Sequence, residues 1–366
     1  MAVYTAIVLL VTLLSWIYEK DNSKYKKFIF ILMVAVPSVI SGIRGVGTDY
    51  YLYKMRFDSI AYGTEVMASG TDLKTPFYET MRIFTRIGLS YQLYIFIISF
   101  ITIGCAFYVI RENRDKIDVT AAVFSYMTMF YLLSFNIFRQ ILSAELFALG
   151  IFLIAERKRK LSGAFVLAVS AMIHSSIIIY ILIYLLFGRD SNRFFKSENK
   201  NKRLIVYLLI ICIIICLPNL NNLSNLIRHL LPHYAYYFLQ FQYRKIGIGI
   251  FRYLLLAWLV CFVLSRRKEE NEPEIVMYMF MSLIGTILTW LSYVSESYIY
   301  RIGYSGIVFL PIVHGYFIKK MHRDKEKKAV GDLLSVLVYL LLFFFLWYDY
   351  IYLNTGEVTP YHLYFQ

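Results

Sequence analysis

Two basic flanks enclose LSGAFVLAVSAMIHSSIIIYILIYLLF, the apolar stretch at residues 161–187. Arginine and lysine fill residues 157–160 before it and recur through residues 189–203 after it. Because cationic loops stay on the cytoplasmic side, both ends of the stretch are expected inside. A spanning helix needs roughly 20 residues, so this stretch is too long for one crossing. The polar step at His174 therefore predicts two short helices that meet at membrane depth, where a broken helix is tolerated if it lines a protein-buried or wet cavity.

The composition of the whole chain is that of a membrane protein. Its 366 residues are 59% hydrophobic and 18% aromatic, and the mean hydropathy is +0.58. These values predict an all-α, polytopic integral membrane protein with one membrane domain over residues 1–366. With the broken pair, the apolar runs predict about twelve crossings and both termini outside. The other expected spans lie near residues 1–18, 27–43, 91–110, 119–135, 137–155, 203–218, 248–265, 275–293, 302–318 and 331–349.

The excess of positive charge follows the loops. The net charge is +14, but the cations lie in short loops between apolar runs, which indicates membrane topology and not nucleic-acid binding. The chain contains no P-loop, GxGxxG, HExxH or CxxC motif, and its four cysteines lie in apolar runs. We therefore expect no cofactor, no metal site, no disulfide framework and no nucleic-acid partner.

On the outer side of this topology, most of the cations are arginine. Arginine forms planar, two-pronged hydrogen bonds with phosphate, so we expect this face to hold a phosphate-bearing ligand at the membrane edge. Anchoring of lipid headgroups by snorkelling arginines is the alternative. We place Arg56, Arg252 and Arg301 among the substrate-binding candidates, although an ion pair with Glu296 is an alternative role for Arg301.

Two long outside loops, at residues 44–90 and 219–247, are expected to form the substrate face. The first opens within SGIRGVGTDYYLYKMRFDSIAY at residues 41–62, a stretch rich in glycine and tyrosine. Its glycines allow a sharp turn, so that Arg44 and Asp49 can point into a common space. An ordinary polar loop with an interfacial tyrosine belt is the alternative.

Further along the first loop, residues 77–87 place apolar side chains at helical spacing, which predicts an amphipathic helix lying on the membrane. The second loop interleaves aromatic rings with polar side chains, a composition that suits sugar faces as well as headgroups. Its His229 and His233 have the i, i+4 spacing of a metal pair, but Pro232 disturbs the helix and no third ligand is evident.

A polar face opens one expected membrane helix. It consists of Asn136, Arg139, Gln140 and Ser143, at positions i, i+3, i+4 and i+7. A cation near the hydrocarbon core costs about 2.5–3.5 kcal/mol on insertion scales, so Arg139 is a functional candidate. Pairing with a buried acid such as Glu145 is the alternative.

Transfer of a sugar from a phosphate carrier needs a base for the attacking hydroxyl and a group that stabilises the departing phosphate. Asp49 or His174 suits the first role, and the residues do not choose between them. For His174 a hydrogen-bonded structural role is the alternative. Arg44, Arg139 and Arg301 suit the second role without a metal.

The chain resembles the EpsG family in three stretches, RGVGTDYYLY at 44–53, FNIFRQILSAELFALGIFLIAERKRK at 135–160 and AMIHSSIIIY at 171–180. That family belongs to the Wzy-type polymerases of O-antigen, capsule and exopolysaccharide synthesis. The resemblance implies a glycosyltransferase with a GT-C-like helical fold on the outer face of the bacterial inner membrane. It would transfer the growing glycan from undecaprenyl pyrophosphate to the non-reducing end of a fresh lipid-linked repeat unit, with inversion.

The resemblance carries over to the matching positions Arg44, Asp49, Arg139, Gln140 and His174. With the placement arguments above, the catalytic candidates are Asp49, Arg139 and His174. The substrate-binding candidates are Arg44, Arg56, Asn136, Gln140, Arg252 and Arg301.

The expected partners are an undecaprenyl-pyrophosphate-linked oligosaccharide, membrane lipids, a chain-length regulator and a flippase. Two other classes of function compete with a polymerase. A flippase or exporter of the same sugars would carry charge along its whole path and show two related halves, whereas the exposed arginines cluster on one side. A membrane acyltransferase usually carries a motif such as HxxxD, but SSII follows His174.

Overall fold

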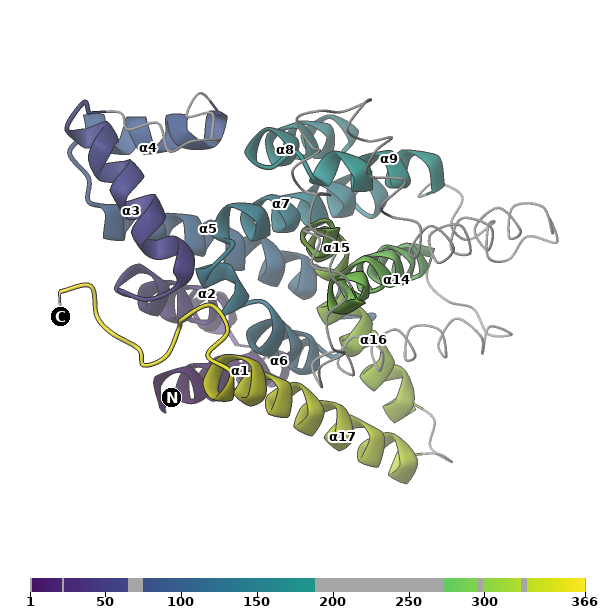
Figure 1. Ribbon diagram of the computed structural model, residues 1–366. Helices are drawn as coiled ribbons and strands as arrows, with labels where there is room; N and C mark the ends of the chain where they lie inside the picture. Colours follow the sequence, from purple (N-terminus) through teal and green to yellow (C-terminus); the bar gives the residue numbers. More distant parts are fainter. Residues whose placement is uncertain are drawn as a thin grey trace. The chain divides into compact units, whose positions relative to one another are not determined.

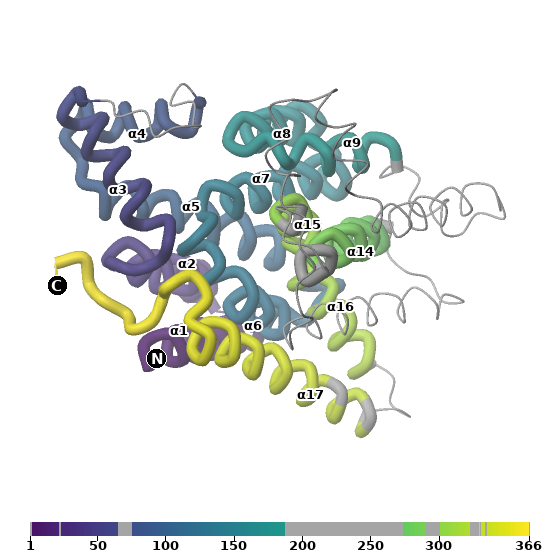
Figure 2. Tube along the Cα trace, in the orientation of Figure 1, coloured from purple at the N-terminus to yellow at the C-terminus, as the bar shows by residue number. Residues whose placement is uncertain are grey.

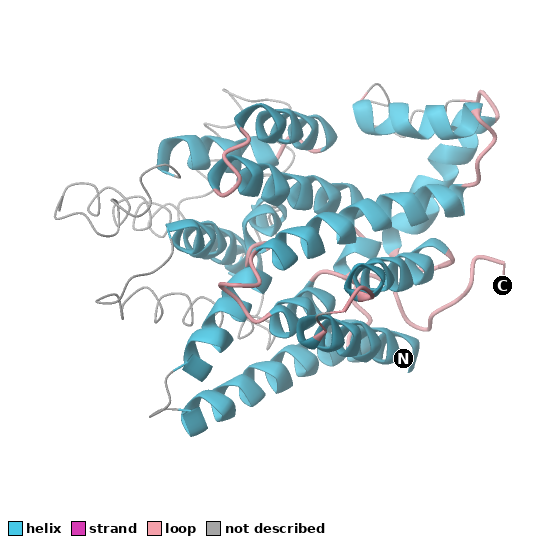
Figure 3. Ribbon diagram, turned by 180° about the vertical axis from the view of Figure 1, so that it is seen from behind, coloured by secondary structure: helices cyan, strands magenta, loops and turns pink. Residues whose placement is uncertain are grey.

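The computed structural model describes residues 2–21, 23–64, 75–187, 273–294, 299–323 and 328–365. Within these ranges the chain is helical and contains no β-strand (Figures 1 and 3), and a single isolated β-bridge joins Arg44 to Leu363. The expected spans at 203–218 and 248–265 and the loop at 219–247, with Arg252, lie outside the described residues.

The chain divides into two compact units, one formed by Met1–Ile177 with Val308–Gln366 and the other by Ile178–Ile307. The helices of the first unit are α1 (Ala2–Lys20), α2 (Lys26–Gly42), α3 (Thr48–Ala61), α4 (Pro76–Arg86), α5 (Tyr91–Glu112), α6 (Val119–Met129), the 3₁₀ turn η1 (Leu133–Phe135), α7 (Phe138–Ala155), α8 (Lys160–Ile173), α16 (Leu310–Arg323), α17 (Lys328–Leu346) and the π-helical turn η5 (Trp347–Tyr352). The described helices of the second unit are α9 (Ile177–Phe187), which begins at the boundary, α14 (Pro273–Val294) and α15 (Ile299–Ile307).

Five helices of the described chain are long and apolar enough to cross a membrane by length and composition. They are Ala2–Lys20, Tyr91–Glu112, Phe138–Ala155, Arg301–His322 and Gly331–Tyr352. Shorter apolar helices accompany them, among them α6, α8 and α9. The described chain is therefore all-helical and consistent with the predicted polytopic membrane protein, while the number of crossings and the single membrane domain stay predictions.

In the first unit, α1 packs against α2 and α6, α5 packs against α2 and α7, and α6 also contacts α16 and α17. Both ends of the chain belong to this unit, and Figure 2 shows the C-terminal segment after α17 in yellow. The Tyr4 hydroxyl of α1 donates to the Val358 carbonyl oxygen at 2.5 Å. This contact fixes the C-terminal segment beside the first helix.

The predicted helix break at His174 is confirmed. Helix α8 ends at Ile173, His174 takes an extended backbone conformation with φ −147° and ψ 114°, and α9 begins at Ile177. One expected span, at residues 302–318, has a turn at residues 308–309 between α15 and α16, within the candidate crossing Arg301–His322. Pro311 explains this turn, because its missing N–H leaves the carbonyl group one turn earlier without a helical donor.

The stretch after Gly47 was predicted as a loop, and this is wrong, because residues 48–61 form α3. Gly47 starts the helix with φ 107°, and a Cβ there would lie 2.9 Å from the Phe135 carbonyl oxygen. Only glycine takes such a backbone conformation without strain. Tyr50, Tyr53 and Phe57 then recur at helical spacing and are buried. The glycines of this stretch therefore begin a helix.

The amphipathic helix expected in the first outside loop is present as α4, with Pro76 in its first turn. Its apolar face does not lie free on a membrane. Phe77, Tyr78 and Met81 are buried in one cluster with Tyr53 and with Tyr94 of α5, while Ile87 is exposed. An apolar stripe is stabilised wherever it loses water, so packing against α3 and α5 meets the same requirement as a lipid surface.

The second unit contains a close helix pair. A Cβ on Gly303 of α15 would lie 2.6 Å from the backbone nitrogen of Thr289 of α14. Glycine at such a contact allows two membrane helices to approach closely. Arg301, a substrate-binding candidate, belongs to α15, and its side chain is exposed.

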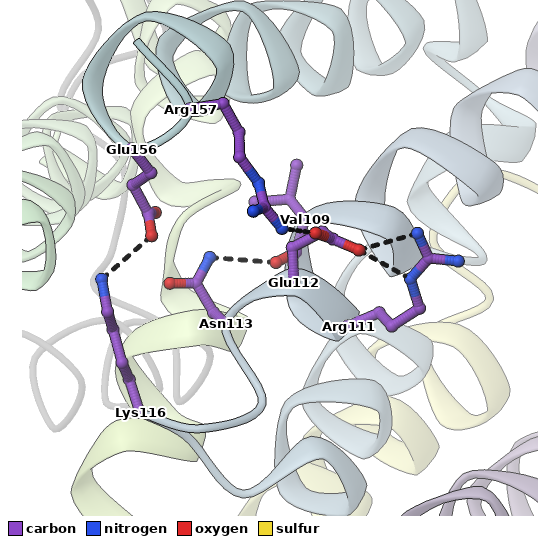
Figure 4. Close-up of polar contacts among 7 residues, drawn as sticks. All are labelled: Val109, Arg111, Glu112, Asn113, Lys116, Glu156 and Arg157. Carbon is purple, nitrogen blue, oxygen red and sulfur yellow. Dashed lines mark hydrogen bonds and ion pairs between the residues drawn. The ribbon is translucent and has the colours of Figure 1, made fainter.

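Charged side chains join the ends of α5 and α7 (Figure 4). The Glu112 carboxylate accepts from Arg111 Nη2 at 2.7 Å and is also paired with Arg157, just beyond α7. Lys116 Nζ lies 3.0 Å from Glu156 Oε2. The basic segment at 157–160 was predicted to face the cytoplasm, and these ion pairs join its start to the end of α5.

Replacing Glu112 by glutamine should lower the midpoint of thermal unfolding of the detergent-solubilised protein by about 2–8 °C. The change removes the charge that holds two arginines, a loss of about 1–3 kcal/mol for charge-assisted hydrogen bonds. Glu79→Gln is the matched control, since Glu79 pairs with Arg82 but its side chain is 53% exposed, and exposed pairs contribute little. Equal midpoints for the two variants would contradict this role of Glu112.

Candidate functional site

The polar face predicted at the start of α7 meets α8. Arg139 is half-buried, and its Nε donates to the Ile173 carbonyl oxygen at 2.7 Å. One turn further along, the Ser143 hydroxyl donates to the Ser170 carbonyl oxygen at 2.8 Å and the Ser170 hydroxyl donates back to the Ser143 carbonyl at 2.7 Å. The Arg139 bond satisfies the Ile173 carbonyl group, at the end of α8 where helical donors run out, whereas the Ser170 carbonyl also accepts from the His174 N–H at 3.1 Å. These bonds also place Arg139 beside the break at His174.

Arg139 lies against the aromatic face of α4. The carbon of its guanidinium is 5.6 Å from the centre of the Phe77 ring and 5.9 Å from that of Tyr78. Both distances are in the range of cation–π attraction. Helix α4 also contacts α8, along the upper edge of Figure 1. Arg139 thus sits where α4, α7 and α8 converge.

A second arginine reaches the same tyrosine from α3. Arg56 is 6% exposed, its Nη1 donates to the Tyr78 hydroxyl, and its guanidinium carbon lies 5.4 Å from the Tyr78 ring and 5.5 Å from the Tyr53 ring. Tyr78 is fully buried and contacts both arginines. We call Tyr53, Arg56, Tyr78, Arg139 and His174 the arginine–tyrosine site.

Asp49 belongs to the electrostatic surroundings of this site. Burial is the largest cause that raises the pKa of the Tyr53 phenol, followed by Tyr78 and by the negative charge of Asp49. Arg139 and Arg56 act in the opposite direction and lower that pKa. Three of the predicted residues, Asp49, Arg56 and Arg139, therefore act on one phenol. Since Asp49 is in the first turn of α3, its charge is also stabilised by the helix dipole.

The ring of His174 is oriented by the residues that follow the break. Its Nδ1 lies 2.8 Å from the Ser176 hydroxyl oxygen and accepts from the Ser176 backbone N–H at 3.4 Å. A backbone N–H can only donate, so Nδ1 is the acceptor. In the neutral ring the proton is then on Nε2. This arrangement makes Nε2 a hydrogen-bond donor.

Arg44 lies in a separate group around the glycine-rich turn. Its side chain is fully buried, its Nη1 donates to the hydroxyl and carbonyl oxygens of Ser41, and its Nη2 lies 3.4 Å from the Phe135 carbonyl oxygen. Its guanidinium carbon is 4.2 Å from the Phe135 ring centre. Burial lowers the pKa of Arg44 from its ordinary value, although a guanidinium keeps its proton in proteins. Binding of substrate by Arg44 stays a prediction.

Asn136 holds the same turn. Its side-chain oxygen accepts from the Thr48 backbone N–H at 2.9 Å and from the Thr48 hydroxyl at 3.1 Å. A Cβ on Gly356 would overlap the Asn136 amide, so the C-terminal segment passes directly over it. Asn136 therefore joins the turn to this segment, and its predicted contact with substrate stays a prediction.

The remaining candidates divide as follows. Gln140 is buried within α7 next to Arg139. Arg301 belongs to the second unit and Arg252 lies outside the described residues. Glu145, the acid proposed as an alternative partner for Arg139, is buried but forms no hydrogen bond or ion pair with it.

Two parts of the structure were missed in the sequence. Tyr53 could have been found if residues 48–61 had been predicted as a helix, because Tyr53 and Arg56 then share a face. Tyr78 lies in the predicted amphipathic helix, but its contacts with both arginines are made only in the fold. The C-terminal segment at 354–364 gave no local signal, since its pairing with the turn is made only in the fold. In the part of the chain that the structure covers, no group of three histidine, cysteine, aspartate or glutamate side chains could hold a metal ion.

Comparison with known proteins gives one match. The model of the EpsG family matches residues 27–363, nearly the whole chain. No curated protein and no solved structure matches the sequence. The match confirms the resemblance seen in the three sequence stretches, and the chain belongs to the EpsG family, whose members are Wzy-type polymerases.

Proposed function

We propose that this protein polymerises lipid-linked oligosaccharide repeat units. In this proposal the growing glycan leaves undecaprenyl pyrophosphate and joins the non-reducing end of a second lipid-linked unit. Family membership supports a polymerase of the exopolysaccharide or O-antigen type. The observation that carries the proposal is the hydrogen bond from Arg139 to the carbonyl oxygen of Ile173, which brings a guanidinium to the helix break beside His174.

The arginine–tyrosine site suits the departing pyrophosphate. Arg56 and Arg139 both contact Tyr78, so two guanidinium groups are held at one ring, and a phosphate group would be attracted to both. Arginine presents several donors in a planar fork that fits phosphate oxygens. The Nε2–H of His174 would add a further donor for the leaving group. Donors fixed before the reaction stabilise developing charge without reorganisation.

The transfer is a single displacement. The acceptor hydroxyl oxygen forms a bond to the anomeric carbon on the face opposite the pyrophosphate, the bond from that carbon to the pyrophosphate oxygen breaks, and the configuration inverts. The hydroxyl proton passes to a base. Asp49 fits this role better than His174, because the neutral His174 ring uses its free lone pair on Nδ1 to accept from Ser176.

The wider setting follows the family. We place the enzyme in a bacterial inner membrane with about twelve crossings, a GT-C-like arrangement and the site on the outer face. Arg44, Asn136, Gln140, Arg252 and Arg301 would contact the remainder of the substrate. The partners would include a flippase that delivers repeat units and a regulator of chain length. The apolar helices support a multi-pass membrane protein.

Arg139→Ala should abolish the polysaccharide ladder in a deletion strain while single repeat units persist. Removing one preorganised donor for a developing charge typically lowers the rate by about 10²–10³-fold. The ladder is read on gels of lipid-linked and cell-surface polysaccharide, with protein levels in the membrane measured alongside. Arg86→Ala is the matched control, because Arg86 is exposed at the end of α4.

A normal ladder from Arg139→Ala would contradict the assignment. The deletion strain itself separates the classes of function. Loss of a polymerase leaves single capped units, loss of a flippase leaves no such sugar at the surface, and loss of an acyltransferase leaves long chains without an ester.

Tyr78→Phe should reduce polymer formation about tenfold, because it keeps the ring but removes the hydroxyl that accepts from Arg56, a charge-assisted bond of about 1.5 kcal/mol or more. Tyr62→Phe, at a side chain that is 81% exposed, should have no effect. The rate of chain growth in membranes of cells producing each variant gives the comparison. Equal rates in both variants would show that the Tyr78 hydroxyl does not position Arg56 for the reaction.

Chelation should leave the reaction intact. The proposed mechanism neutralises the pyrophosphate with arginines alone, so EDTA should not change the rate of the purified protein in lipid. The rate is measured after metal removal and again after magnesium or manganese is added back. A strict requirement for either ion would contradict the arginine-only mechanism.

A further inference from the structure

Arg44 is a buried charge without a counter-charge. Its side chain has no exposed surface, and its Nε has no hydrogen-bond partner. The partners of its other nitrogens are oxygens of Ser41 and Phe135, all neutral, and no carboxylate of the described residues pairs with it. Removing an ionised group from water is costly, and buried charges are normally paired. A guanidinium kept in this way points to a negative group that is absent from the chain itself.

The side chains around the Arg44 guanidinium are aromatic and uncharged. Tyrosines at positions 4, 50, 91 and 131 are near enough for their hydroxyls to interact with the guanidinium. Three of these hydroxyls donate to backbone carbonyl groups, Tyr4 to Val358, Tyr91 to Tyr50 and Tyr131 to Pro37. Because these tyrosines are neutral, they do not compensate the positive charge of Arg44.

The glycine-rich turn beside Arg44 directs backbone N–H groups at the C-terminal segment. Gly45 donates to the His362 carbonyl oxygen at 2.8 Å, Gly47 to Glu357 at 3.2 Å and Thr48 to Gly356 at 3.0 Å. Thr48 is the first residue of α3, a helix of 14 residues. Glycine-rich turns that open a helix bind phosphate through such N–H groups, with the helix dipole adding to the attraction. Here carbonyl oxygens of the C-terminal segment accept from these N–H groups, and the Thr48 N–H also donates to the Asn136 side-chain oxygen at 2.9 Å.

Residues 356–364 of the C-terminal segment are the non-helical part of the surroundings of Arg44. Several of these residues are exposed. Backbone bonds such as that from Tyr364 N–H to Ile43 at 3.1 Å hold the segment, together with the bond from the Tyr4 hydroxyl to the Val358 carbonyl oxygen. Most other residues around Arg44 belong to the packed helices α1, α2, α3 and α5. Segments with few buried contacts open at the lowest free energy. An isolated β-bridge joins Leu363 of this segment to Arg44, and the Tyr361 hydroxyl donates to the Ile40 carbonyl oxygen at 2.9 Å, so the segment lies directly against the residue that carries the guanidinium.

We propose that Arg44 and the N–H groups of Gly45, Gly47 and Thr48 form an anion site for a phosphate or pyrophosphate group, which enters when residues 356–364 lift from the turn. The anion replaces the three carbonyl oxygens and supplies the missing counter-charge. This rests on the proposed function only in taking the lipid-linked pyrophosphate as its physiological source. The site is separate from the arginine–tyrosine site, which lies around Tyr78.

A reversible disulfide tests whether the segment must lift. A Cβ on Gly45 would lie 3.2 Å from the Cα of Tyr364, so the pair Gly45→Cys and Tyr364→Cys is within reach of a bond. The probe is inorganic pyrophosphate, titrated into full-length protein in nanodiscs. The Arg139→Ala background removes binding at the other site and makes the readout independent of polymerisation. Oxidation of the double variant should weaken its binding at least tenfold relative to the same variant in the reduced state.

Three further arms complete this test. Each single cysteine variant should be insensitive to the oxidant, and Arg44→Gln should bind at least tenfold more weakly in either state. Undecaprenyl pyrophosphate in the same nanodiscs identifies the source, since binding of the lipid as well as the free anion indicates the carrier, whereas binding of the free anion alone indicates a soluble phosphate ligand. Equal binding by the oxidised and reduced double variant would overturn the proposal.

Hydrogen exchange in the unmodified turn gives a second measurement that does not depend on a cysteine variant folding. At saturating pyrophosphate the Tyr364 amide, which loses its acceptor on Ile43, should exchange at least tenfold faster. The amides of Gly45, Gly47 and Thr48 should stay protected, because they then donate to the anion. Unchanged protection of Tyr364 at saturation would overturn the proposal. If the unmodified protein binds pyrophosphate in this way but makes no polymer, the result would count against the proposed function and not against the anion site.

Discussion

A helix that ends inside an apolar bundle leaves carbonyl groups without donors, and α8 meets this constraint at Ile173. Water cannot satisfy such groups within a bilayer, so a donor must come from a neighbouring helix. Arg139 supplies it with its Nε. The same contact leaves the two terminal nitrogens of the guanidinium for other partners. The end of α8 thereby fixes the position of the Arg139 charge on the neighbouring helix α7.

The positions of α3 and α4 follow from that charge. A guanidinium near the hydrocarbon region needs partners that tolerate its planar faces, and aromatic rings do so without neutralising it. Phe77 and Tyr78 of α4 supply these rings and lie against Arg139. The hydroxyl of Tyr78 in turn accepts from Arg56 of α3. Positive charge is therefore concentrated around one buried phenol.

Local patterns in the sequence were enough for much of the fold. The apolar runs, the break at His174 and the amphipathic α4 all depend on residues close in the chain, so their spacing predicts them. Helix α3 was missed because its glycine-rich start has the composition of a loop, although the tyrosines after Gly47 recur at helical spacing. The C-terminal segment was missed for a different reason. Its partners are the turn at 43–48 and Tyr4, more than 300 residues away, and no local spacing encodes that pairing.

The partners of Arg44 are neutral carbonyl and hydroxyl oxygens, where a carboxylate would stabilise the buried charge more. A carboxylate would compensate a buried guanidinium better than the carbonyl oxygens of Ser41 and Phe135, and it would also neutralise the charge permanently. A phosphate group would then find no net positive charge and would meet a competing acceptor in the same space. Carbonyl groups and aromatic faces partly satisfy the guanidinium and leave its charge in place. In this protein the C-terminal segment completes the arrangement, because its backbone pairs with the turn that carries Arg44 and adds only neutral carbonyl groups there.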